Sequence, residues 1–133
     1  MKRRKILVVD DDRTVLDSCK RVLEAEGFKV VLASSVKKAI DILEAEYFDL
    51  MILDVKMPKH DGMYLLEKIK EKWPLDRWPE LPVVVMSGYP TNDTISESLV
   101  RGAADFLSKP FTPDELITST NIILQRSKNH GKQ

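Results

Sequence analysis

Apolar residues along this chain occur in two patterns, short continuous runs and longer stretches with helical spacing. A continuous apolar run of a few residues is typical of a strand that is buried on both faces of a parallel sheet. The runs predict five strands, at Lys5–Val9, Lys29–Ala33, Leu50–Leu53, Val83–Met86 and Asp105–Leu107. The intervals between them are long enough for a helix after each strand.

Five apolar stripes with helical spacing fill these intervals and follow the last strand. They run from Val15 to Leu23, Val36 to Leu43, Leu65 to Ile69, Ile95 to Val100 and Leu116 to Leu124. Gly27 ends the first helix, Ser35 is an expected N-cap of the second, and Thr112 to Glu115 form a capping box before the fifth. Strands that alternate with helices over short links imply a parallel sheet with helices on both faces.

Acidic residues stand directly after two of the predicted strands. Asp10, Asp11 and Asp12 follow the first strand, and Asp54 follows the third. The carboxyl ends of parallel strands share one edge, where open α/β sheets bind ligands. Repulsion makes such a cluster costly unless a cation neutralises it, and Mg²⁺ prefers oxygen ligands. The sequence therefore predicts a site for a hard divalent metal such as Mg²⁺.

Two further polar residues follow predicted strands and belong to the same edge. Ser87 comes after the fourth strand and Lys109 after the fifth. Phosphoryl transfer needs a nucleophile, a metal, and a cation or hydroxyl for the oxygens of the transferred group. Asp54 is the candidate nucleophile, since carboxylates form phosphoryl-enzyme intermediates. Asp12 is the expected cap of the first helix.

Composition narrows the class of protein. The chain has 133 residues, which fits one domain, and its 43% hydrophobic content suffices for a core. The 21 basic and 21 acidic residues cancel, which argues against direct nucleic-acid binding through broad positive charge. The single cysteine, Cys19, excludes an internal disulfide framework. Its place on an apolar stripe predicts a buried structural thiol.

No apolar run of the sequence approaches the length of a membrane span. The basic segment Lys2-Arg3-Arg4-Lys5 is followed by only four apolar residues before the acids, so it leads into a strand and is not a signal peptide. We therefore expect a cytoplasmic protein without membrane insertion, and no second domain after the fifth helix.

Taken in order, four motifs give the chain a clear resemblance to the receiver domain of two-component response regulators. The motifs are Ile6–Asp12, Leu53–Pro58 with Asp61-Gly62, Val85–Gly88 and Gly102–Phe111. The resemblance covers about residues 4 to 126 and implies an α/β, flavodoxin-like fold. In that fold a doubly wound five-stranded parallel sheet of order 2-1-3-4-5 carries five helices. The resemblance divides the chain into a receiver domain, residues 1–126, and a polar C-terminal tail, residues 127–133.

The resemblance implies a role for each residue of the acidic site. Asp54 is the phosphoacceptor and also a metal ligand. Asp10 and Asp11 hold Mg²⁺, with Asp11 the direct ligand, and the backbone carbonyl of Lys56 completes the protein ligands. Lys109 contacts the phosphoryl oxygens, and the Lys109-Pro110 bond is cis.

It also implies a switch. Ser87 is the hydroxyl that turns toward the phosphoryl group, and the affected face is made of the fourth helix, fifth strand and fifth helix. Phe106 is either the aromatic switch residue or a core aromatic, and the sequence leaves both readings open. His60 and Tyr89 border the site.

By resemblance, the chain is a phosphorylation-activated signalling switch of a two-component system or phosphorelay. The expected donor is a histidine kinase or a histidine phosphotransfer protein, and the expected target is a downstream protein. The chain would catalyse only its own phosphorylation and dephosphorylation and is not otherwise an enzyme.

Two alternatives remain. Asp10 to Thr14 resembles the nucleophile motif of haloacid-dehalogenase-like phosphatases, in which Asp10 would attack, but that reading leaves Asp54 unexplained. The other is a receiver that serves only as a docking module without phosphotransfer. Trp73 and Trp78, in a proline-rich stretch, are expected to pack over the loop before the fourth strand rather than to form a partner surface.

Overall fold

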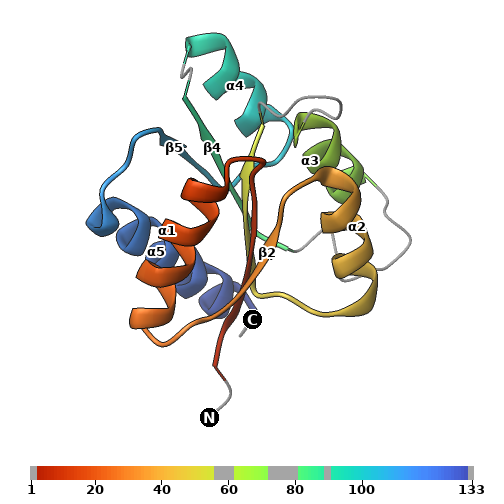
Figure 1. Cartoon of the computed structure of the whole chain (residues 1–133). Coiled ribbons are helices and arrows are strands. Elements are labelled where there is room, and N and C mark those ends of the chain that lie inside the picture. Colours follow the sequence, from red (N-terminus) through yellow and green to blue (C-terminus); the bar gives the residue numbers. More distant parts are fainter. Residues whose placement is uncertain (1–2, 56–61, 72–80, 89–90, 132–133) are drawn as a thin grey trace.

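The computed structural model describes residues 3–55, 62–71, 81–88 and 91–131 of the chain. The strands are β1 (Lys5–Val9), β2 (Lys29–Ala33), β3 (Leu50–Asp54), β4 (Val83–Ser87) and β5 (Asp105–Ser108). The helices are α1 (Arg13–Ala25), α2 (Val36–Ala45), α3 (Gly62–Glu71), α4 (Asn92–Val100) and α5 (Pro113–Gly131). The strands form one parallel sheet in the order β2-β1-β3-β4-β5 (Figure 1), which confirms the predicted flavodoxin-like fold.

Three strands extend one residue beyond the predicted ends. Asp54 pairs with Met86, and Ser87 pairs with Ser108. The ladder is made by backbone groups, so it continues past the last apolar side chain. Asp54 and Ser87 are therefore the last residues of rigid strands rather than the first residues of loops.

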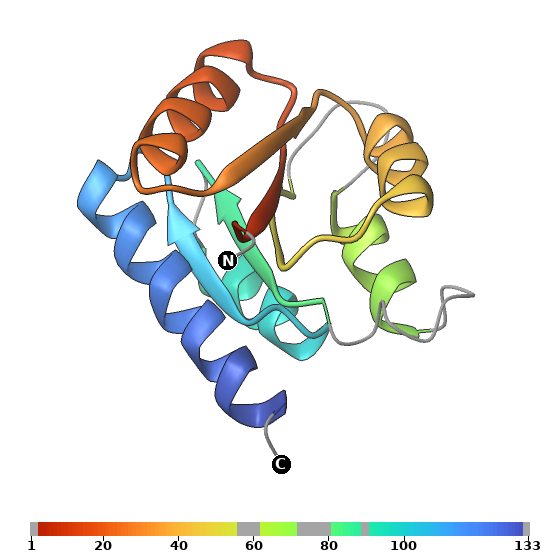
Figure 2. The ribbon, with the colours of Figure 1, turned by 90° about the horizontal axis from the view of Figure 1, so that it is seen from below.

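The sheet separates two hydrophobic cores. Along β1, Ile6 and Val8 pack with residues of α1 and α5, whereas Leu7 and Val9 pack with residues of α2 and α3. Figure 2 shows α1 and α5 on one side of the sheet and α2 and α3 on the other. This alternation is that of a strand buried on both faces. The two cores fix the positions of the strand ends on which the polar site is built.

The helix ends follow the sequence signals. Asp12 Oδ1 accepts a hydrogen bond from the Thr14 N–H at 2.9 Å. Thr112 and Glu115 exchange two bonds, Thr112 N–H to Glu115 Oε1 at 2.8 Å and Glu115 N–H to Thr112 Oγ1 at 3.1 Å. The Ser35 cap is also present, and Gly27 has a φ of 95° after α1. Helix α5 continues through Gly131, so the tail marked off from the sequence is helical over residues 127–131.

No helix in the described part of the chain is long and apolar enough to cross a membrane. The longest of these helices, α5, is amphipathic: Leu116, Ile123 and Leu124 are buried against the sheet, whereas Ile122 is 45% exposed. A one-sided stripe of this kind is typical of a helix that covers one face of a sheet.

Two neighbouring hydroxyls on α5 should respond in opposite ways to removal. Thr120 is buried, and its Oγ1 has no hydrogen-bond partner among the described residues, whereas Ser119 Oγ donates to Asp105 Oδ2 at 2.8 Å. We expect Thr120→Val to raise the free energy of unfolding by about 0.5–1.5 kcal/mol, because an unpaired buried hydroxyl is removed at equal volume. Ser119→Ala should lower it by about 1–2 kcal/mol. Urea unfolding measures both, and a destabilised Thr120→Val protein would show that the hydroxyl is bonded.

Candidate functional site

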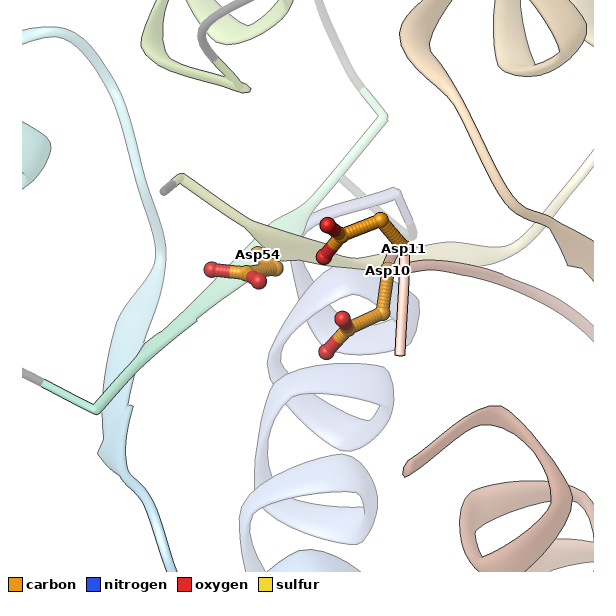
Figure 3. Close-up of side chains that lie close together, drawn as sticks. All are labelled: Asp10, Asp11 and Asp54. Atoms are coloured by element: carbon orange, nitrogen blue, oxygen red, sulfur yellow. The ribbon is translucent and has the colours of Figure 1, made fainter. Parts of the chain in front are cut away.

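Three carboxylates meet at the carboxyl edge of the sheet. Asp10 follows β1 directly, Asp11 is the next residue, and Asp54 ends β3. One oxygen from each lies within 4.8 Å of the others (Figure 3). Asp10 and Asp54 are buried, with 0% and 4% exposure, while Asp11 is exposed. The structure therefore brings together the acids that the sequence placed at this edge.

Lys109 lies between the two buried carboxylates. Its Nζ donates to Asp10 Oδ2 at 2.6 Å and to Asp54 Oδ2 at 3.2 Å. The backbone holds it there, because the Lys109 N–H donates to the Ser87 carbonyl at 2.8 Å. The predicted cis Lys109-Pro110 bond is present. The last residue of β4 and the residue after β5 are thus joined beside the acids, as their positions after apolar runs indicated.

The charges of the cluster shift the pKa values of two groups in it. Burial raises the pKa of Asp10, and the nearby charge of Asp54 raises it further, against the hydrogen bonds from Lys109 and from the Asp12 N–H. For Lys109, burial alone would lower the pKa, but the hydrogen bond to Asp10 and the charges of both carboxylates outweigh burial and raise the pKa. The lysine is therefore held as a cation at neutral pH.

The donor set suits a hard divalent cation. The site offers three carboxylates, two of them buried, and one ammonium group close to them. An excess of negative charge in a poorly solvated place is stabilised by a cation, and oxygen donors are the ligands that Mg²⁺ prefers. Asp11, which is exposed, can reach an ion that enters from solvent.

Gly62, at the start of α3, packs directly against the nucleophile candidate's backbone. A Cβ atom at this position would overlap the Asp54 carbonyl oxygen and lie 2.8 Å from Val55 Cα. The sequence marked Asp61-Gly62 only as part of a motif. It gave no sign that the glycine allows a close approach between α3 and the end of β3, because that contact depends on the fold.

Gly62→Ala should destabilise the protein and disturb the acid site. We expect the free energy of unfolding to fall by about 1–3 kcal/mol, because the added methyl must displace the backbone of β3. The matched control is Gly88→Ala, since a Cβ at Gly88 meets nothing within 4 Å and the residue is exposed. Denaturant unfolding of both variants tests this. Equal stability of the two variants would contradict the close approach at Gly62.

A cavity of about 450 Å³ opens beside Lys109. Residues of α1 line it on one side, among them Val15 and Cys19, and Pro110 and Phe111 line it on the other. Cys19 is buried as predicted. Burial, helped by the charge of Asp10, raises the pKa of its thiol to about 11. The thiol is therefore neutral and is not a nucleophile of the site.

The remaining residues selected from the sequence fall into two groups. Ser87 is buried, and Phe106 is half-buried against the core that contains α2 and α3, a place consistent with either reading of this aromatic. The other five lie outside the described residues: Lys56, His60, Trp73, Trp78 and Tyr89.

Comparison with known families and curated proteins gives one consistent result. The sequence profile of the response regulator receiver domain matches residues 6–121. The response regulator SaeR of Staphylococcus aureus (strain USA300) is 33% identical over 128 residues, which are 96% of this chain and 54% of SaeR. The response regulator MprA of Mycobacterium avium is 35% identical over 127 residues, 93% of this chain and 52% of MprA. The chain spans about half the length of these relatives.

Solved structures agree with the sequence relatives. A CheY-like response regulator receiver domain protein from Methanospirillum hungatei JF-1 superposes with a TM-score of 0.88 at 31% identity, over 97% of this chain and 99% of that one. NtrX from Brucella abortus, solved in complex with ATP, gives a TM-score of 0.89 at 33% identity. That match covers 98% of this chain but 29% of NtrX. The likeness thus extends over nearly the whole chain.

Proposed function

This chain belongs to the family of response regulator receiver domains, and on that premise we propose that it is a signalling switch phosphorylated at Asp54. The observation that carries the proposal is the arrangement of Asp10, Asp11 and Asp54 around one shared point with Lys109 against the two buried acids. This arrangement provides a nucleophile, a metal site and a cation for the transferred group, which are the parts that phosphoryl transfer requires.

In the proposed reaction a carboxylate oxygen of Asp54 forms a bond to the phosphorus of a donor phosphohistidine. The phosphorus–nitrogen bond breaks, and its electron pair and a proton go to the imidazole of the donor. The product is an acyl phosphate on Asp54, which water later hydrolyses. Asp54 suits this role because the end of β3 holds it rigidly and its carboxylate lies at the open edge of the sheet.

The proposed cofactor is Mg²⁺, held by the carboxylates of Asp11, Asp10 and Asp54, with the backbone carbonyl of Lys56 as a further ligand. When bound, the ion offsets the repulsion between these acids and the incoming phosphoryl oxygens. Lys109 is the second positive charge, and after transfer its ammonium group donates to an oxygen of the phosphoryl group. Because Lys109 is already oriented by Asp10, the chain needs little rearrangement to do so.

The proposed conformational switch involves the ends of β4 and β5, which are joined by a backbone hydrogen bond. Ser87 donates its hydroxyl to the phosphoryl group, and the backbone bond from Lys109 to Ser87 couples the two loops that follow β4 and β5. The face of α4, β5 and α5 is the proposed contact for a downstream protein target. Leu99 and Val100 of α4 and Ile122 of α5 are 48%, 86% and 45% exposed, so these two helices offer apolar area for a partner.

The proposed phosphodonor is a histidine kinase or a histidine phosphotransfer protein that docks beside the acids. The cavity between α1 and the loop after β5 lies next to Lys109 and has apolar residues on both sides, Val15 and Phe111. A helix of the donor that packs there would bring its histidine to the open edge of the sheet. In this account the chain catalyses only its own phosphorylation and dephosphorylation.

The phosphatase alternative places the nucleophile at Asp10, and the hydrogen bonds of Asp10 argue against it. Its Oδ1 accepts the Asp12 N–H at 2.8 Å and its Oδ2 accepts Lys109 Nζ at 2.6 Å. A fully buried carboxylate with both oxygens engaged is a poor nucleophile. A docking module without phosphotransfer would not require the cluster of Asp10, Asp11 and Asp54, so this alternative does not explain why the three acids lie together.

Phosphorylation by acetyl phosphate tests the proposal, with intact mass as the readout. We expect one added phosphoryl group with Mg²⁺ and none with EDTA. For Asp11→Asn, the Mg²⁺ concentration that gives half-maximal labelling should rise about 10-fold or more, because loss of a direct metal ligand should cost at least as much as loss of a group that only orients one. Labelling that does not depend on Mg²⁺ would contradict the assigned metal site. If Asp11→Asn requires the same Mg²⁺ concentration as the parent, Asp11 is not a ligand of the metal.

A further inference from the structure

A second concave surface lies at the opposite edge of the sheet, where β1 and β2 begin. This basic cleft has a volume of about 760 Å³, and its cations are Arg3, Arg4, Lys5 and Lys29. Lys5 and Lys29 are neighbours in the parallel ladder, and the Lys29 N–H donates to the Arg4 carbonyl at 2.8 Å. Backbone pairing therefore holds like charges side by side, which is unfavourable unless anions lie close to them.

Two carboxylates from the segment between α2 and β3 neutralise part of this charge. Glu46 forms an ion pair with the Lys5 side chain, and Asp49 Oδ1 is 4.0 Å from Arg4 Nη1. Within the described ranges no ion pair involves Arg3 or Lys29, and both side chains are exposed. The basic cleft thus has an excess of positive charge, although the chain as a whole has a formal net charge of zero.

Aromatic rings line the same cleft. Lys5 Nζ lies 5.1 Å from the centroid of the Phe48 ring, so the ammonium group lies over this ring. The neighbouring Tyr47 is 66% exposed. An exposed ring beside unneutralised cations can bind a flat ring by stacking while the cations bind phosphate oxygens. Neither feature serves the acid site, which lies at the other end of β1.

We propose that the basic cleft binds a nucleotide, with its base against Tyr47 and its phosphates facing Arg3 and Lys29. The cleft volume lies in the range of small-molecule sites. An acidic peptide would also neutralise the positive charge of the cleft. The volume of the cleft and the exposed Tyr47 ring favour a small ligand in which a planar ring is joined to phosphates. The site is separate from phosphorylation of Asp54 and does not depend on it.

The test is calorimetric titration of the full chain with ATP in the presence of EDTA, which leaves no metal at the acid site. We expect saturable one-to-one binding. Tyr47→Ala should weaken the affinity by about fivefold or more, because the stacked base loses its ring. Lys29→Ala should also weaken it, because the phosphates lose a positively charged donor. The matched control Lys37→Ala removes an exposed lysine on α2 and should bind as the parent does. Asp54→Asn should also bind ATP normally, because its site is at the opposite edge.

Three results would overturn this assignment. Absence of saturable ATP binding would show that the cleft is not a nucleotide site. Inorganic tripolyphosphate that binds as tightly as ATP, with no loss in Tyr47→Ala, would show that charge acts without the ring. A polyglutamate peptide that binds more tightly than ATP and competes with it would assign the cleft to an acidic protein segment instead.

Discussion

Asp54→Asn will accept no phosphoryl group from acetyl phosphate with Mg²⁺ present, while the parent chain accepts one. The amide has almost the same shape as the carboxylate but is not a nucleophile at neutral pH, so the reaction loses its attacking atom. Asp54 is 4% exposed and is the last residue of β3, so the amide at this position is held where the carboxylate stood. Intact mass after a fixed incubation measures the loss.

The matched control for this variant is Asp41→Asn, which makes the same change on the exposed face of α2. It should be labelled at the parent's rate and stoichiometry. Denaturant unfolding of Asp54→Asn tests whether the unlabelled variant is folded. If folded Asp54→Asn takes up one phosphoryl group at the parent's rate, Asp54 is not the phosphoacceptor.

Lys109→Met should have the largest effect on stability of the substitutions considered. Lys109 Nζ contacts Asp10 at 2.6 Å and Asp54 at 3.2 Å, and its loss removes a positive charge that contacts both buried carboxylates. Removal of one partner from a buried ion pair costs about 3–5 kcal/mol. Since the Lys109 side chain is 20% exposed, we expect the free energy of unfolding without metal to fall by about 2–4 kcal/mol.

Two further results follow from the charge of Lys109. Mg²⁺ should restore part of the lost stability of Lys109→Met, because a divalent ion replaces the missing positive charge. In the parent chain the folded-state pKa of Lys109 is raised above 10.5. Its contribution is therefore complete below that pH and is lost as the pH rises through the folded-state pKa.

The matched control for Lys109→Met is Lys37→Met, the same change at an exposed helix position. A surface change of this kind should alter the free energy of unfolding by no more than about 0.5 kcal/mol. Equal unfolding curves for the two variants would mean that Lys109 does not neutralise the buried acids.

The positions of the strands could be predicted because continuous apolar runs mark strands that are buried on both faces of the sheet. Residues of β1 such as Val8 and Val9 are buried on opposite faces, and only apolar side chains tolerate that. The predicted strand ends were one residue short at Asp54 and Ser87, because polarity of a side chain does not end a backbone ladder. Capping residues were found because their bonds are local.

Long-range contacts were not accessible from the sequence. The close approach of Gly62 to the Asp54 carbonyl depends on how α3 packs. Lys109 could be placed at the edge, but its hydrogen bonds to both Asp10 and Asp54 depend on the fold. The basic cleft joins residues from β1, β2 and the segment before β3, and the zero net charge of the chain concealed it.

The central claim is that Asp54 carries the phosphoryl group, and its location can be measured directly. Borohydride reduces an aspartyl phosphate to homoserine, so the labelled chain is reduced, digested and mapped by mass spectrometry. The account predicts homoserine at position 54 and an unchanged aspartate at position 10. Homoserine at position 10, with Asp54 unmodified, would contradict the account and support the phosphatase alternative.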